Sequence, residues 1–187
     1  SITKKGLLFC LVLINFLCFK SNAQTNVSGG IYQNTTWTTT GSPYLVTGSI
    51  VVFPGNTLTI EPGTVILGDY ASKASLTISK GATLIADGLE TDPIIFTSNR
   101  SVKRAGDWGG IIILGDAPSN KFGNGSVASF YTDLSSSAYA NTNFGGINSE
   151  SNSGVLRFVR IEYAGKRIKN DDYFNGLLLA GVGITTI

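Results

Sequence analysis

The sequence predicts an all-β protein with the architecture of a parallel β-helix, a solenoid whose short strands stack on their counterparts one coil away. Three observations predict this fold. Gly, Ser, Thr and Asn are abundant and only 14% of the 187 residues are charged, a composition that disfavours helical bundles and coiled coils. Apolar residues alternate over short segments that end at glycines. One segment also repeats itself 26 residues later in the chain.

The first 23 residues have the pattern of a secretory signal peptide. Lys4 and Lys5 precede an apolar run over residues 6–19, and small residues then lead to a cleavage site between Ala23 and Gln24. The apolar run is too short to cross a bilayer, and the residues before the two cysteines do not fit a lipoprotein signal. We therefore expect residues 1–23 to direct the chain to the export machinery and to leave no transmembrane anchor.

Composition excludes several kinds of chemistry. The chain has no His, and both cysteines, Cys10 and Cys18, lie within the signal peptide. Ser/His/Asp triads, cysteine nucleophiles, His/Cys zinc sites and disulfides are therefore excluded from residues 24–187. In the same segment basic and acidic residues almost balance, so a nucleic acid is not expected as a partner.

Residues 24–49 are predicted to form an N-terminal cap and the first strand. The segment is rich in Thr and Asn and contains Trp37. A solenoid needs a covering segment over its first coil, because the apolar interior would otherwise meet water. The alternative is a disordered leader.

The repeat predicts how the first coils stack. It pairs Ile50 with Leu76, Val52 with Ile78, Gly55 with Gly81, Thr57 with Thr83, Leu58 with Leu84 and Ile60 with Ala86. Residues 61–64 and 88–93 are rich in Pro, Gly and Asp and are predicted corners between strands. A β-sandwich would instead join its strands by hairpins, and no Asn-Gly or Asp-Gly turn separates equal strands over residues 50–98.

The second half of the chain contains a long interruption. Residues 107–115 are the most apolar stretch after the signal peptide, and Trp108 is expected to close one side of the core. Residues 116–153 lose the alternation, so we predict a loop insertion that protrudes from one coil.

Strand character returns over residues 154–163, where Val159, Ile161 and Tyr163 are expected to face inward. Residues 176–178 repeat residues 154–156 at an offset of 22. We expect the solenoid to resume here and to be unfinished at Ile187. We therefore expect a β-helix domain over residues 50–187 that is incomplete at its C-terminus, in a chain that forms the front part of a longer protein.

Four motifs in order carry a family resemblance. They are Gly55-Asn56-Thr57-Leu58-Thr59-Ile60-Glu61-Pro62-Gly63-Thr64-Val65-Ile66, Pro93-Ile94-Ile95-Phe96-Thr97-Ser98, Gly106-Asp107-Trp108-Gly109-Gly110-Ile111 and Val159-Arg160-Ile161-Glu162-Tyr163-Ala164-Gly165. On these motifs, residues 30–187 resemble exported right-handed parallel β-helix proteins of Bacteroidetes, which share the pectin-lyase-like fold. The resemblance implies secretion or display on the outer surface of a Gram-negative bacterium, with a type IX secretion sorting domain beyond Ile187. It does not by itself imply an activity, because this fold carries many functions.

A candidate calcium site lies near residue 171. Lyases that share the fold typically use carboxylates to bind calcium and an Arg or Lys to abstract a proton. The nearest counterparts here are Asp171 and Asp172, whose oxygens suit calcium, with Asn170 and Asn175 beside them. The alternative is that the two aspartates are solvated turn residues, because adjacent residues of a strand point to opposite faces.

A candidate ligand-binding site combines charged and aromatic residues. Arg160 and Glu162 lie two residues apart on one strand and share its outward face, where they form either a simple ion pair or a sugar-binding pair. Tyr131 and Tyr139 in the insertion are candidates for the aromatic platform that a sugar ring needs. The one basic cluster, Arg100, Lys103 and Arg104, is either a solvated loop or a contact for an acidic glycan.

These features lead us to expect a secreted or cell-surface β-helix scaffold without enzymatic activity, which serves in adhesion or binds a polysaccharide or cell-surface glycan. No cofactor is expected, apart from calcium as a candidate ligand. One alternative is a polysaccharide lyase or glycoside hydrolase whose site lies partly beyond residue 187. The other is a purely structural stalk. An enzyme would gather carboxylates and a basic residue in one groove, whereas a scaffold would scatter them.

Overall fold

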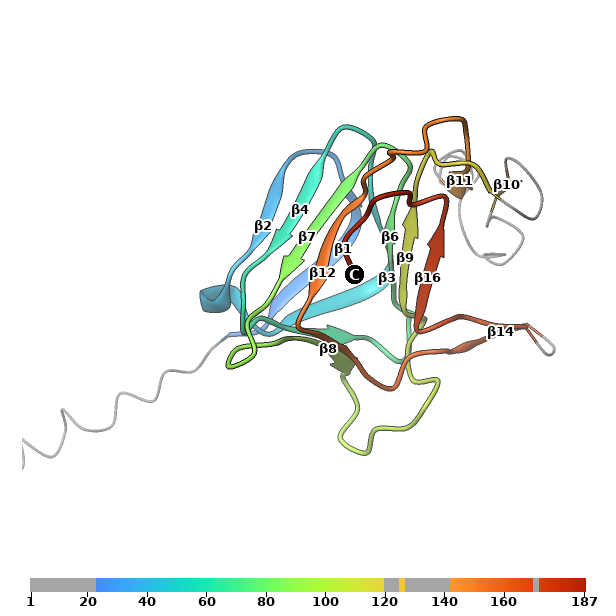
Figure 1. The fold of residues 1–187 in the computed structure, drawn as a ribbon. Helices are drawn as coiled ribbons and strands as arrows, with labels where there is room; N and C mark the ends of the chain where they lie inside the picture. Colours follow the sequence, from blue (N-terminus) through green and yellow to red (C-terminus); the bar gives the residue numbers. More distant parts are fainter. Residues whose placement is uncertain (1–22, 120–124, 127–141, 170–171) are drawn as a thin grey trace, which may run out of the picture.

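The computed structural model describes residues 23–119, 125–126, 142–169 and 172–187, and it confirms the predicted parallel β-helix (Figure 1). Residues 1–22 of the predicted signal peptide lie outside the described residues. Within the described residues, no helix is long and apolar enough to cross a membrane. A short 3-10 helix, η1 (Thr39–Gly41), precedes β3.

The strands stack in parallel on three sides of the solenoid. Side A contains β3 (Tyr44–Val52), β5 (Val65–Gly68), β8 (Ile94–Ser98) and β13 (Val159–Ile161). Side B contains the second half of β3, β6 (Ser75–Ile78), β9 (Ile111–Leu114) and β16 (Leu177–Ala180). Side C contains β2 (Thr35–Trp37), β4 (Thr57–Ile60), β7 (Thr83–Asp87) and β12 (Gly154–Arg157). Strand β1 (Thr25–Ile31) pairs in parallel along β3.

The stacking of the first coils follows the predicted repeat. Ile50 pairs with Leu76 on side B, and Leu58 pairs with Leu84 on side C. The other predicted strand pairs, Val52 with Ile78, Thr57 with Thr83 and Ile60 with Ala86, are also in register. At the corner, the Gly55 N–H donates to the Gly81 carbonyl oxygen at 2.8 Å, and both glycines have positive φ. The repeat in the sequence is therefore the coil-to-coil register of the structure.

Apolar ladders fill the interior. On side A, Tyr44, Ile66, Phe96 and Ile161 occupy successive rungs of one ladder. Trp108 is buried, and its ring stacks on that of Phe96 with centroids 6.3 Å apart. Its Nε1 donates to the carbonyl oxygen of Glu162 at 2.7 Å, so the buried indole leaves no polar atom unpaired. The expectation that Trp108 closes one side of the core agrees with this position.

Three expectations about residues 154–187 are wrong. The predicted single strand over residues 154–163 breaks at Phe158, whose φ of 48° turns the chain from side C to side A. Tyr163 also has positive φ, and its side chain is exposed rather than directed inward. The offset of 22 does not describe stacking, because β12 pairs with β7 while β16 pairs with β9. Strands on different sides share the same alternation, so alternation alone does not identify a strand's side.

Two antiparallel hairpins project from the coils. In the predicted insertion, β10 (Gly125–Ser126) pairs with β11 (Asn143–Phe144). The second hairpin joins β14 (Arg167–Lys169) to β15 (Asp172–Tyr173) and extends away from the solenoid (Figure 1). Phe144 and Phe174 pack on the outward-facing side chains of β9, Ile112 and Leu114, which are buried as a result. One aromatic side chain from each of these two segments therefore covers the outer face of side B.

Candidate functional site

The predicted pair Arg160 and Glu162 forms an exposed ion pair at the edge of side A. Arg160 lies in β13 between Val159 and Ile161, which pack against the core, so its side chain faces solvent. Its guanidinium donates to the Glu162 carboxylate. An exposed pair of this kind contributes about 0–1 kcal/mol to stability, so it has little structural importance.

The structure places different aromatic residues beside this pair from those that the sequence suggested. Tyr131 and Tyr139 lie outside the described residues. Phe158 directly precedes β13 and Tyr163 follows its end by two residues, and both side chains are exposed. Both residues have positive φ, 48° and 57°, which is costly for a bulky residue. Sequence reasoning missed them because it treated residues 154–163 as one straight strand.

The candidate calcium site lies largely outside the described residues. Asp171 lies outside the described residues, and Asp172 belongs to the backbone of β15 in the projecting hairpin. Over the described ranges, no group of three His, Cys, Asp or Glu side chains lies close enough to hold a metal ion. A calcium site at Asp171 and Asp172 stays a prediction.

Described carboxylates outside that hairpin mostly bind nearby structural groups. Arg157 on β12 holds Asp87 on the adjacent strand β7 with two hydrogen bonds of 2.8 and 2.6 Å. The hydrogen bond from Arg157 lowers the pKa of the Asp87 carboxyl. Asp116 lies 3.2 Å from the Lys80 ammonium, and the Thr39 N–H donates to Glu61 at 2.9 Å. These pairs tie one coil to the next.

A cluster of cations lies where the chain turns from side A to side B. We call it the basic corner, which comprises residues 69–74, 99–110 and 162–166 of three successive coils. Its backbones stack directly: the Gly109 N–H donates to the Ala74 carbonyl at 2.7 Å, and the Gly165 N–H donates to the Gly109 carbonyl at 3.0 Å. The charged side chains that it carries are therefore positioned by the coil register.

The base of the basic corner is the buried carboxylate of Asp107. It accepts hydrogen bonds from the Ser98 hydroxyl at 2.7 Å, the Arg100 guanidinium at 3.0 Å and the Arg104 N–H at 2.9 Å. Burial alone would raise the pKa of Asp107, but these hydrogen bonds outweigh it and hold the pKa below its usual value. Asp107 is thus a fixed anion that organises the loop over residues 99–106.

Tyr70 and Lys166 form the outer part of the basic corner. The Lys166 Nζ lies 3.7 Å from the centroid of the Tyr70 ring, and the Arg100 guanidinium lies 4.5 Å from it. Lys166 also donates to the Tyr70 carbonyl at 2.6 Å and to the Asp107 carbonyl at 3.3 Å. Burial lowers the pKa of Lys166, and the neighbouring cations Lys73 and Arg100 lower it further, against the opposing effect of nearby aspartates.

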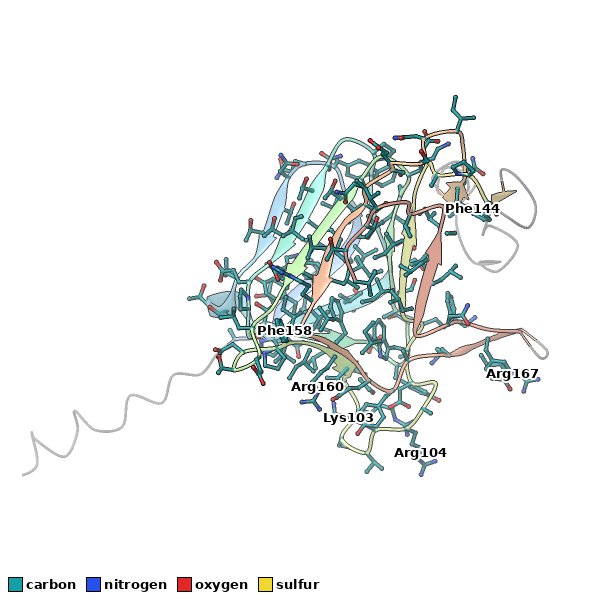
Figure 2. The ribbon with its side chains drawn as sticks, in the orientation of Figure 1. Lys103, Arg104, Phe144, Phe158, Arg160 and Arg167 are labelled. Atoms are coloured by element: carbon teal, nitrogen blue, oxygen red, sulfur yellow. The ribbon has the colours of Figure 1, made fainter. Side chains whose placement is uncertain are left out.

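Lys103 and Arg104 complete the corner on its solvent side. Lys103 donates to the Ser98 carbonyl at the end of β8, next to β13. Figure 2 shows Lys103, Arg104 and Arg160 directed outward at the same end of the molecule. The sequence had identified Arg100, Lys103 and Arg104 as a cluster. It had not identified Tyr70 or Lys166, which join that cluster only through the stacking of three coils.

The three stacked sides define the class of this molecule as a parallel β-helix protein, with loop insertions at its corners and a basic corner between sides A and B. Comparison with protein families then gives a match between residues 29–187 and the pectate-lyase like beta helix domain, and the chain belongs to this family. No curated protein and no solved structure matches the chain. The predicted β-helix family is thereby confirmed, while a Bacteroidetes origin and a type IX sorting domain stay expectations.

Proposed function

We propose that this protein is a non-enzymatic β-helix scaffold, secreted or displayed on the outer cell surface, that binds a polysaccharide or cell-surface glycan and serves in adhesion. The observation that carries the absence of catalysis is that the described carboxylates named above are already hydrogen-bonded or ion-paired. Asp69 and Glu162 share the basic corner with Asp107, but Asp69 accepts hydrogen bonds from Ser72 and Asn99 and Glu162 pairs with Arg160. Asp87, Asp107 and Asp116 lie at three different corners of the solenoid, and each is bonded to its own cation.

Catalysis on a β-helix would need these groups to converge. A glycoside hydrolase needs two carboxylates about 5–9.5 Å apart on either side of the scissile bond. A calcium-dependent lyase needs several carboxylates around the metal and a free Arg or Lys beside them. In the described parts of the chain, Arg160 is bonded to Glu162 and Arg157 to Asp87, so neither is a free base beside a group of acids. This arrangement supports a scaffold over an enzyme.

Exposed aromatic residues support glycan binding over a purely structural stalk. Phe158 and Tyr163 have exposed side chains, and both lie close in sequence to the outward-facing Arg160. Aromatic rings supply large, flat apolar surfaces on which the C–H faces of a sugar can pack, while charged groups hydrogen-bond its polar substituents. Export, which the signal peptide predicts, would bring these surfaces into contact with extracellular polysaccharides.

The proposal is tested with the full-length protein on a panel of polysaccharides, with added calcium and separately with a chelator. Binding is measured together with the absorbance of unsaturated products and the release of reducing ends. We expect binding without turnover. Turnover would overturn the scaffold and favour a lyase or hydrolase, in which case Arg160, Glu162, Asp171 and Asp172 are the first residues to substitute. If the protein neither binds nor degrades any of these polysaccharides, a structural stalk would be favoured.

A further inference from the structure

Asn175 and Gly176 join the projecting hairpin to the solenoid, between the end of β15 and the start of β16. The side chain of an asparagine can react with the backbone nitrogen of the next residue, and glycine favours this reaction because it has no Cβ to hinder the approach. The reacting atoms belong to one chain segment, so the reaction needs no enzyme, only freedom of the two groups to meet. Asn175 is the one described asparagine that precedes a glycine.

Both reacting groups are unpaired within the described part of the chain. Asn175 is exposed, and its side-chain amide makes no hydrogen bond with another described residue. The Gly176 N–H, which is the nucleophile, likewise has no acceptor there. The neighbouring groups hold the segment instead. The Phe174 N–H donates to the Lys166 carbonyl at 2.9 Å, and the Gly176 carbonyl accepts from the Ile111 N–H at 3.0 Å. The fold therefore positions the pair without engaging either reacting group.

The other described asparagines are each followed by a residue with a side chain. Most of their amides are also engaged. The Asn99 amide, for example, donates to the Asp69 carboxylate at 2.6 Å. Hydrogen bonds likewise hold the amides of Asn26, Asn34, Asn56, Asn148 and Asn152. Asn175 therefore differs from these residues in two independent ways, a following glycine and an amide that is not engaged.

The fold does not require glycine at position 176. A Cβ there would lie 3.7 Å from the Ala164 Cβ and 3.9 Å from the Ile161 Cγ2, which are ordinary contacts. Gly176 is also not among the glycines with positive φ. Gly110 differs, because a Cβ there would lie 2.3 Å from the Asn175 carbonyl oxygen. Gly176→Ala should therefore keep the fold and hinder only the attacking nitrogen.

We propose that Asn175 is a site of spontaneous deamidation in the folded protein. The Gly176 nitrogen attacks the Asn175 Cγ and gives up its proton, and the Cγ–Nδ2 bond breaks with release of ammonia. Water then opens the five-membered cyclic imide. Attack of water at Cγ gives Asp, and attack at the main-chain carbonyl carbon gives isoaspartate, whose backbone passes through Cγ. One water is consumed and one ammonia is released, so no oxidant, reductant or other reactant is needed.

The two products differ in their effect on the hairpin. Asp adds a negative charge and leaves the backbone length unchanged, whereas isoaspartate adds one atom to the backbone between Phe174 and Leu177. Phe174 and Leu178, on either side of the reacting pair, both pack on the outer face of side B. The extra atom displaces one relative to the other, so isoaspartate loosens the attachment of the hairpin. This inference is independent of glycan binding.

The test incubates the full-length protein in slightly alkaline buffer below its unfolding temperature and follows residue 175 by peptide mapping with mass spectrometry. The same protein in urea gives the rate for the unfolded chain. We expect Asn175 to deamidate in the folded protein within about tenfold of the unfolded rate, because no local opening has to precede the reaction. We expect the amides of Asn99 and Asn152 to persist over the same period. Isoaspartate, which separates from Asp by chromatography, should be among the products.

The matched variant is Gly176→Ala, in which deamidation of the folded protein at residue 175 should fall about tenfold or more. Asn175→Asp supplies the normal product alone. Hydrogen exchange over residues 172–178 should be faster in the isoaspartate fraction than in Asn175→Asp, and equal exchange would overturn the loosening of the hairpin.

Two results would overturn the proposal itself. If the amide at residue 175 persists in the folded protein while the unfolded chain loses it, the fold protects the pair. If wild type and Gly176→Ala react at the same rate, the Gly176 nitrogen is not the nucleophile. Should Gly176→Ala fail to fold, Asn175→Gln repeats the test, because the longer side chain closes a less favourable ring and the acidic product should again fall about tenfold or more.

Discussion

The Asp107 carboxylate lies 3.0 Å from the Arg100 guanidinium, and the two partners differ sharply in exposure. The Asp107 side chain is 2% exposed and the Arg100 side chain 34%. The anion is therefore buried beneath its cation, and it is compensated by two further donors from Ser98 and Arg104. A buried carboxylate of this kind is stable only while all its donors stay in place.

Asp107→Asn should destabilise the protein by about 1–3 kcal/mol at neutral pH. The neutral Asn side chain cannot form the charge-assisted hydrogen bonds, and its NH2 group would face the N–H and O–H donors that the carboxylate accepts. The folded-state pKa of Asp107 lies below the ordinary value of 3.8, so its contribution is fully present above about pH 4 and is lost as pH falls through the folded-state pKa. Urea unfolding at a series of pH values measures this. The gap between wild type and variant should narrow in acid, and a gap that is constant with pH would contradict the assignment. Asp92→Asn, at an exposed site, is the control.

Leu76→Ala should cost about 2–5 kcal/mol of unfolding free energy, because it removes a rung from the buried ladder between Ile50 and Ile111. Leu89→Ala is the matched control, since that side chain is 52% exposed and its loss should change stability by less than about 0.5 kcal/mol. Chemical denaturation of both variants measures the difference. Similar losses in the two would mean that the ladder contributes no more than the surface does.

Two glycines with positive φ should respond differently to alanine. A Cβ at Gly154 would lie 1.9 Å from the Leu84 carbonyl oxygen, so Gly154→Ala should separate β12 from β7 and cost more than about 3 kcal/mol. A Cβ at Gly55 would have no atom within 4 Å, so Gly55→Ala should cost only the backbone strain, about 1–2 kcal/mol. Thermal unfolding of the two variants compares them. The reverse order would show that coil contact at Gly154 is looser than the structure indicates.

Phe158 should tolerate glycine better than a β-branched residue. Its φ is 48° and its side chain is 54% exposed, so the backbone conformation rather than buried contact dominates its energetics. We expect Phe158→Gly to change stability by less than about 1 kcal/mol and Phe158→Val to cost about 1–2 kcal/mol. Equilibrium unfolding distinguishes them. Comparable large losses in both would show that the Phe158 ring itself stabilises the corner.

The sequence predicted the fold where the coils are regular. Between Ile50 and Ala86 the spacing of 26 residues is the same on sides B and C, so like residues fall on like residues and the register is visible. From β9 onward the coils have other lengths: Leu76 pairs with Ile111, because the loop over residues 99–110 lengthens that coil, and later insertions lengthen the next. The spacing between similar segments then no longer indicates which strands pair. For this reason residues 176–178 were matched to residues 154–156, although the two segments lie on different sides.

Only those contacts of the candidate site that join residues close together in the sequence could be predicted. Arg160 and Glu162 are two residues apart on an extended chain, so their pairing followed from strand geometry. Tyr70 and Lys166 are 96 residues apart and lie in corners that have no alternation. Their contact depends on how three coils stack, and no short-range pattern in the sequence contains that information.

The ladder of Tyr44, Ile66, Phe96 and Ile161 keeps its register although the sequence separation between rungs increases along the chain. Each corner can therefore lengthen without moving the strands on either side of it, since the rungs are set by pairing and not by loop length. Such a frame is suited to carrying grafted peptides. A foreign epitope placed in the corner between β9 and β12 would extend from a rigid support, which makes the solenoid a candidate carrier for multivalent antigen display.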